Sequence, residues 1–130
     1  MSDAQEKAAK QARNSRRRRE IAEHHEQLES LHRKLTRLKH AKITMVAAMA
    51  TLEQVESRAN SFGRGLDDSR WRGQRRQMFD ERFDSVTRAI KRDVEQNKEN
   101  KATVQRKISE LESRATDVER VISSLESAME

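Results

Sequence analysis

Apolar residues recur in alternating steps of three and four along the first half of the chain. Counting from Ile21, twelve heptad positions extend to residue 59, and nine of them are apolar: Ile21, Leu28, Leu31, Leu35, Leu38, Met45, Met49, Leu52 and Ala59. The other three positions hold His24, Lys42 and Glu56. An apolar seam sustained over six heptads is typical of a long helix in a coiled coil.

The second half of the chain repeats this pattern. Eleven of its fourteen heptad positions are apolar: Phe83, Ile90, Val94, Val104, Ile108, Leu111, Ala115, Val118, Ile122, Leu125 and Met129. Thr87, Asn97 and Lys101 are the polar exceptions. The spacing therefore predicts a second long helix.

A turn-like stretch separates the two patterns. All three glycines lie within residues 63–73, and glycine readily adopts the left-handed conformation that ends helices. Asp67, Asp68 and Ser69 are suited to cap the helix that follows. We expect a basic and helical arm over residues 1–20, a helix over 21–62, a loop over 63–70 and a helix over 71–130.

Charge indicates how these helices are arranged. Residues 1–20 carry seven Lys/Arg and three Asp/Glu, whereas residues 109–130 carry two Arg and six Asp/Glu. Folding the chain back on itself near residue 66 brings these opposite charges together. The predicted fold is an all-α, single-domain, antiparallel two-helix hairpin that completes a helical bundle with a partner.

Two features of the pattern indicate that a partner is needed. Residues 43–52, which include Met45 and Met49, contain no charge, so this part of the helix is apolar around most of its circumference. With a fold near residue 66, the end of the second seam would face the stretch 4–15 and lack a full partner, because that stretch offers Ala4, Ala8, Gln11 and Ser15. We therefore expect these residues to bind a partner: Val118, Ile122, Leu125 and Met129.

The composition of the chain argues against several classes of protein and site. The 130 residues include 28 Lys/Arg and 22 Asp/Glu, for a net charge of +6, but no Cys and no Pro. Without Cys there is no disulfide framework or thiolate metal site, and none of the four His stand at i, i+4 spacing. No segment has the length and apolarity of a membrane span or a signal peptide. No catalytic motif is present, so we expect neither an enzyme nor a metal or cofactor site.

A run of four arginines, residues 16–19, precedes the leucine pattern. A basic-region leucine zipper would place an Arg at a fixed distance after Asn14, where this chain has Ala22. We expect an exposed basic helix face that is neutralised by the acidic end of the second helix. A basic coiled-coil protein that binds nucleic acid and a self-associating coiled-coil scaffold are the alternatives.

The sequence Trp71-Arg72-Gly73 stands where the loop becomes the second helix, and Met78, Phe79 and Phe83 follow on one helical face. Together these residues resemble the W-x-G helical-hairpin family of type VII secretion in Gram-positive bacteria. The similarity is greatest to the longer members, which are encoded beside LXG-domain toxins. Trp71 and Gly73 match the hairpin motif of that family, and the resemblance implies that Phe79 and Phe83 are flanking contacts.

The resemblance implies a function without chemistry. Such members are targeting chaperones, or adaptors, that bind the helical N-terminal export domain of a toxin and help present it to the secretion ATPase. A second small helical protein can join the bundle. The chain has no Tyr for the family's Tyr-x-x-x-Asp/Glu export signal, which favours an adaptor in the cytoplasm and leaves its export together with the partner open.

Overall fold

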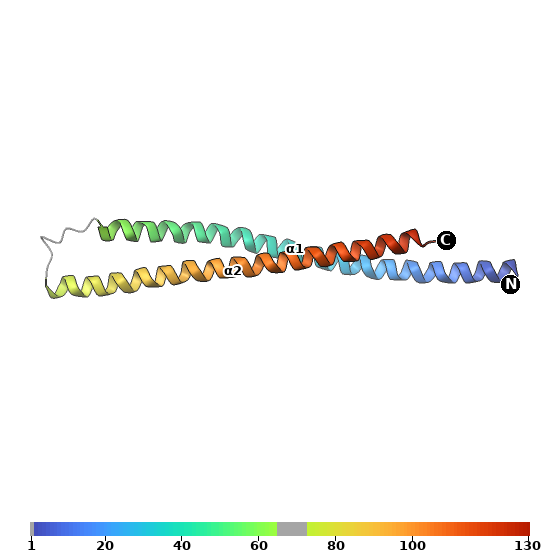
Figure 1. Ribbon diagram of the computed structural model, residues 1–130, viewed down its shortest axis with the longest axis horizontal. Helices are drawn as coiled ribbons and strands as arrows, with labels where there is room; N and C mark the ends of the chain where they lie inside the picture. Colours follow the sequence, from blue (N-terminus) through green and yellow to red (C-terminus); the bar gives the residue numbers. More distant parts are fainter. Residues whose placement is uncertain (1, 65–72) are drawn as a thin grey trace. The chain divides into compact units, whose positions relative to one another are not determined.

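The computed structural model describes residues 2–64 and 73–130, and these form two helices and no strand. Helix α1 spans Asp3–Arg64 and helix α2 spans Gln74–Ser127 (Figure 1). The predicted all-α hairpin is thus confirmed. The basic arm and the first predicted helix belong to one continuous helix, α1.

The ends of the helices follow from local hydrogen bonds. Before α1, Ser2 and Gln5 form a reciprocal cap: the Gln5 amide donates to Ser2 Oγ at 3.2 Å, and the Ser2 amide donates to Gln5 Oε1 at 3.1 Å. Before α2, the Gly73 carbonyl accepts a bond from the Gln77 amide at 3.0 Å. Gly73 has a φ of 91°, a conformation that side chains disfavour. The caps expected at residues 67–69 lie outside the described residues.

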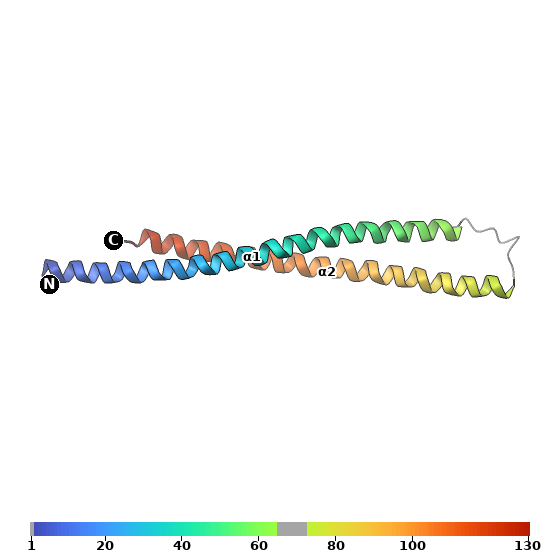
Figure 2. The ribbon, with the colours of Figure 1, turned by 180° about the vertical axis from the view of Figure 1, so that it is seen from behind.

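The chain forms two compact units, each of which contains antiparallel segments of α1 and α2. Unit 1 comprises Met1–Lys39 and Arg106–Glu130, and unit 2 comprises His40–Gln105. In unit 1, the C-terminal end of α2 lies beside α1, and the first turns of α1 extend past it (Figures 1 and 2).

Unit 1 has a continuous apolar core. Among the described residues, seven of the eight buried apolar side chains belong to it: Leu31, Leu35, Ile108, Leu111, Ala115, Val118 and Ile122. Leu111 is the most buried of them, with 2% of its surface exposed. Val94 is the corresponding buried residue of unit 2. Interdigitating seam residues therefore remove apolar surface from water mainly in unit 1.

The alignment of the two helices in unit 1 differs from the expectation. The Asn14 side-chain amide donates to the Glu130 carbonyl at 2.9 Å, and the Glu130 amide donates to Asn14 Oδ1 at 3.0 Å. Residue 130 thus lies beside residue 14, whereas a fold centred near residue 66 would place this end beside Ala4. The expected centre is therefore wrong. In the same direction, α1 continues through Gly63 to Arg64, and α2 begins only after Gly73.

This alignment supplies partners for the end of the second seam. Val118 and Ile122 are buried in unit 1, with 8% and 6% of their surfaces exposed, and Leu125 and Met129 are half-buried. The expectation that this stripe lacks a full partner within the chain is therefore wrong for Val118 and Ile122. A partner can reach Val118 and Ile122 only if α1 moves away from them.

Candidate partner-binding surface

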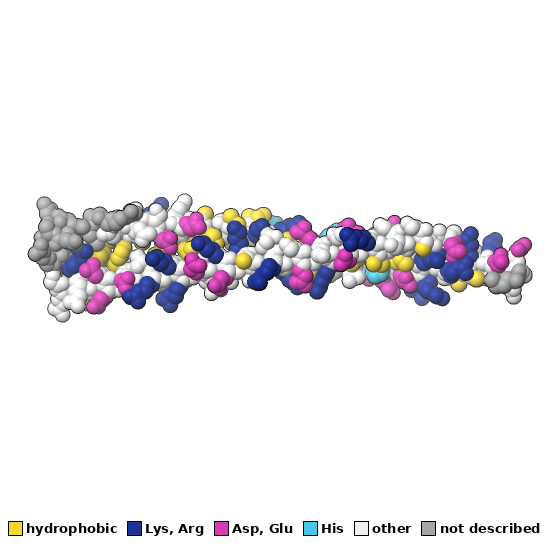
Figure 3. Space-filling view, in the orientation of Figure 1, with side chains coloured by type: hydrophobic (Ala, Val, Ile, Leu, Met, Phe, Trp, Pro, Cys, Tyr) yellow, Lys and Arg dark blue, Asp and Glu magenta, His cyan; other side chains and the backbone are white. Residues whose placement is uncertain are grey.

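Large apolar side chains are exposed mainly in unit 2. Among the described residues, six of the seven exposed large apolar side chains belong to it: Ile43, Val46, Val55, Phe62, Met78 and Val86. Ile43 is the extreme case, with 67% of its surface exposed. Figure 3 shows hydrophobic side chains on the surface along the α1 segment of this unit. Exposed apolar groups that gather in one region are typical of an interaction surface.

The seam of unit 2 also contains more polar residues than the seam of unit 1. Lys42 donates to Gln105 Oε1 at 2.5 Å, and the Asn97 side-chain amide donates to the Met45 carbonyl at 3.3 Å. Met45 and Met49 are half-buried in this seam, so they are interior contacts rather than exposed ones. Polar groups at seam positions specify alignment but lower stability. We therefore expect the seam of unit 2 to contribute less to stability than the seam of unit 1.

Three aromatic rings of the described residues form a cluster in unit 2. The ring centroids of Phe79 and Phe83 are 5.7 Å apart with nearly parallel planes, and Phe62 lies 6.1 Å from Phe79 and 6.2 Å from Phe83. Gly63 makes room for the Phe83 ring, because a Cβ atom at this position would be 2.8 Å from Phe83 Cε1. The structure thus brings together the predicted residues Phe79 and Phe83, and it adds Phe62.

Heptad spacing extends this cluster into a longer surface. Val55 is seven residues before Phe62, and Val86 is seven residues after Phe79, so each valine lies on the same face of its helix as the corresponding ring. Because the helices are antiparallel, both steps lead in the same direction away from the cluster. Phe62, Val86 and Val55 are exposed by 56%, 53% and 41% of their surfaces. We call Val55, Phe62, Phe79 and Val86 the aromatic edge.

The sequence contains a signal for this edge outside the seam positions. Val55 and Val86 each stand directly before a seam position, and Phe62 follows Val55 by one heptad. An apolar residue repeated outside the seam indicates a second apolar face. Trp71, expected to bind a partner as part of the hairpin motif, lies outside the described residues, as does Arg72.

A model of the YwqH-like family matches residues 12–130 of the chain. The chain belongs to the YwqH-like family. YwqH-like proteins belong to the helical proteins associated with type VII secretion. Comparison with curated proteins and with solved structures found no match.

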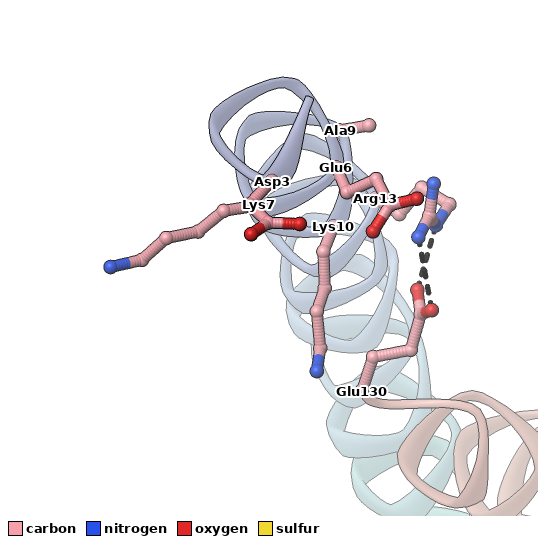
Figure 4. Close-up of a pocket in the computed structure, with 7 residues that line it drawn as sticks. All are labelled: Asp3, Glu6, Lys7, Ala9, Lys10, Arg13 and Glu130. Carbon is pink, nitrogen blue, oxygen red and sulfur yellow. Dashed lines mark hydrogen bonds and ion pairs between the residues drawn. The ribbon is translucent and has the colours of Figure 1, made fainter. Parts of the chain in front are cut away.

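In this YwqH-like chain, a cluster of charged side chains joins the C-terminal residue Glu130 to α1 in unit 1. Arg13 donates two hydrogen bonds to the Glu130 carboxylate, at 2.7 and 3.0 Å (Figure 4). Arg17 adds a third at 3.1 Å. The hydrogen bonds from Arg13 lower the pKa of Glu130 from its ordinary 4.5 to about 2, and Arg17 contributes to the shift. The same contact raises the pKa of Arg13. The cluster holds the end of α2 against α1.

The arginine run is neutralised only in part. Arg17 pairs with Glu130, whereas Arg16, Arg18 and Arg19 are exposed and take part in none of the ion pairs between described residues. Across residues 2–64 and 73–130, no group of three His, Asp or Glu side chains is arranged to hold a metal ion. No helix in these two ranges combines the length and apolarity that crossing a membrane requires.

Proposed function

We propose that this YwqH-like protein is an adaptor that binds the helical N-terminal domain of an LXG-type toxin and helps present it to the type VII secretion machinery. The observation that carries the proposal is the exposed apolar surface of unit 2, which contrasts with the closed core of unit 1. Membership of the family and the resemblance at Trp71 and Gly73 support the secretion context. The proposed role is binding without catalysis.

The partner in this proposal is helical because of the form of the exposed surface. The aromatic edge presents apolar groups at heptad spacing along two antiparallel helices, which suits ridges of side chains on another helix. Fully burying a Val or Phe side chain contributes about 1.5–3 kcal/mol of transfer free energy, and these side chains, which are about half exposed, contribute part of it. The aromatic edge and Ile43 together thus favour association with a helix, against the cost of ordering two molecules.

Binding can be tested by co-expressing the chain with the N-terminal domain of an LXG toxin from the same genome. We expect a stable complex in which Val55→Asp with Val86→Asp weakens capture at least tenfold, because a carboxylate would be buried at two contacts. Val121→Asp is the matched control, since Val121 is 41% exposed but lies in unit 1. Equal capture by the double variant, with helicity intact by circular dichroism, would contradict the proposal.

The role in secretion calls for a second variant. Trp71→Ala is expected to leave helicity and toxin binding nearly unchanged but to abolish export of the toxin, because the family motif places Trp71 at the tip of the hairpin rather than in its seam. The measurement is the amount of toxin in the culture medium relative to the cells. Export at the normal level would show that Trp71 is a packing residue only.

A further inference from the structure

Unit 2 contains an open groove of about 450 Å³ that shares no lining residue with the aromatic edge. Two α1 residues and four α2 residues line it: Lys42, Met49, Lys98, Lys101, Ala102 and Gln105. We call it the lysine groove. Three of its six residues are lysines and none is acidic.

Apolar groups form the floor of the lysine groove. Met49 is half-buried in the seam, and Ala102 is exposed. Val46, 45% exposed, stands four residues after Lys42 and three before Met49, so it lies on the same face of α1. The groove thus combines an apolar floor with a basic rim.

The lysines of the rim differ in what they contact. Lys42 is held by its hydrogen bond to Gln105. Lys98 lies 3.9 Å from Glu95, and both of these side chains are largely exposed. Lys101 occupies a seam position and is half-buried, and no carboxylate of the described residues lies within 4.0 Å of its ammonium group. A half-buried ammonium group without an anionic partner raises the free energy of the unbound hairpin.

We propose that the lysine groove binds an acidic amphipathic helix of the partner. The inference rests on the proposed adaptor function and names the chemistry of the helix: apolar residues at i, i+3 and i+4 that cover Val46, Met49 and Ala102, flanked by Glu or Asp. Those carboxylates pair with Lys98 and Lys101. Lys91, exposed and one heptad before Lys98, continues the basic rim along α2.

Charge complementarity together with the apolar floor selects this occupant. A helix that offered only apolar groups would bury Lys101 further without a counter-charge, which is unfavourable. A nucleic acid would supply negative charge but mostly sugar and phosphate surface, which gains little from contact with Val46, Met49 and Ala102. An amphipathic helix with acidic flanks satisfies both parts of the groove.

The test uses the full chain and two synthetic amphipathic peptides that differ only in their flanking residues. One peptide has Leu at its seam positions and Glu beside them, and the other has Lys in place of each Glu. Fluorescence anisotropy with labelled peptides measures their affinities for the wild type and for Lys98→Glu with Lys101→Glu. We expect the wild type to bind the acidic peptide at least tenfold more tightly than the basic one, and the double variant to reverse that preference.

Two further variants keep the test decisive. Lys7→Glu with Lys34→Glu makes the same change of charge at exposed positions of unit 1 and is expected to leave the peptide preference unchanged. Lys91→Glu with Lys98→Glu changes exposed residues only, so it reports on the rim if Lys101→Glu disturbs folding. The proposal would be overturned if the acidic peptide bound the wild type and all the variants equally. It would also be overturned if the wild type bound duplex DNA and the groove variants lost only that binding.

Capture of the toxin domain, measured beside the peptide affinities, distinguishes a failure of the groove proposal from a failure of the adaptor role. If the toxin domain binds but is held equally by wild type and Lys98→Glu with Lys101→Glu, the groove proposal is wrong and the adaptor role stands. If no toxin domain binds while the peptides show the expected reversal, the groove proposal stands and the adaptor role is wrong.

Discussion

Replacing Ile122 by alanine is expected to destabilise unit 1, because this residue lies in its core and not on a surface that awaits a partner. Ile122 is 6% exposed, whereas its neighbour Val121 is 41% exposed on the same helix. Truncating a buried Ile to Ala costs about 2–5 kcal/mol, the sum of lost transfer free energy and the cavity left behind. A pair of helices encloses a cavity less fully than a larger core, so we expect about 2–3 kcal/mol.

The assay is urea unfolding followed by circular dichroism, with Val121→Ala as the matched control. With a denaturant slope of about 1–3 kcal/mol per molar, a loss of about 2–3 kcal/mol lowers the midpoint by roughly 0.7–3 M urea. The control is expected to change the free energy of unfolding by less than about 0.5 kcal/mol, as exposed substitutions usually do.

The location of the effect is a second readout. Hydrogen exchange should rise most in the unit 1 segments that pack together, residues 2–39 and 106–130, since local openings follow local packing. Equal destabilisation by Ile122→Ala and Val121→Ala would refute the assignment of Ile122 to the core. Loss of partner binding by Ile122→Ala with unchanged stability would instead restore the interpretation of this stripe as an interface.

Three further predictions concern other parts of the chain. Gly63→Leu should destabilise unit 2 by about 1–3 kcal/mol in urea unfolding, because its Cβ atom would overlap the Phe83 ring, whereas Ser61→Leu should have little effect. The lowered pKa of Glu130 adds stability that is complete above about pH 4.5 and is lost as the pH falls through about 2. Glu130→Gln should therefore lower the melting temperature more at pH 7 than at pH 2, and an equal difference at both would contradict the role of the Arg13 contact. Replacing residues 16–19 by Gln should leave toxin capture unchanged, while a salt-sensitive DNA complex that disappears in this variant would favour nucleic-acid binding.

The sequence by itself determined the two helices and the face that each one buries. All the heptad positions counted from Ile21 and from Phe83 are buried or half-buried, including the polar ones such as His24 and Asn97. Such a prediction succeeds because side chains three and four residues apart share one face of a helix, so the pattern depends only on local geometry. The absence of charged residues from 43–52 likewise predicted an apolar surface, and Ile43 and Val46 are exposed there.

Only the tertiary structure decided how far one helix is displaced along the other. A seam that repeats every seven residues keeps its apolar contacts when the helices slide by whole heptads, so periodicity alone does not select an alignment. In unit 1 the contact between Asn14 and Glu130 marks the alignment, in which the expected partner stripe at Val118 and Ile122 is part of a core. In unit 2 the contacts of Lys42 with Gln105 and of Asn97 with Met45 mark it. The aromatic edge and the lysine groove depend on the alignment within unit 2, because residues of α1 and α2 that are far apart in sequence must meet to form them.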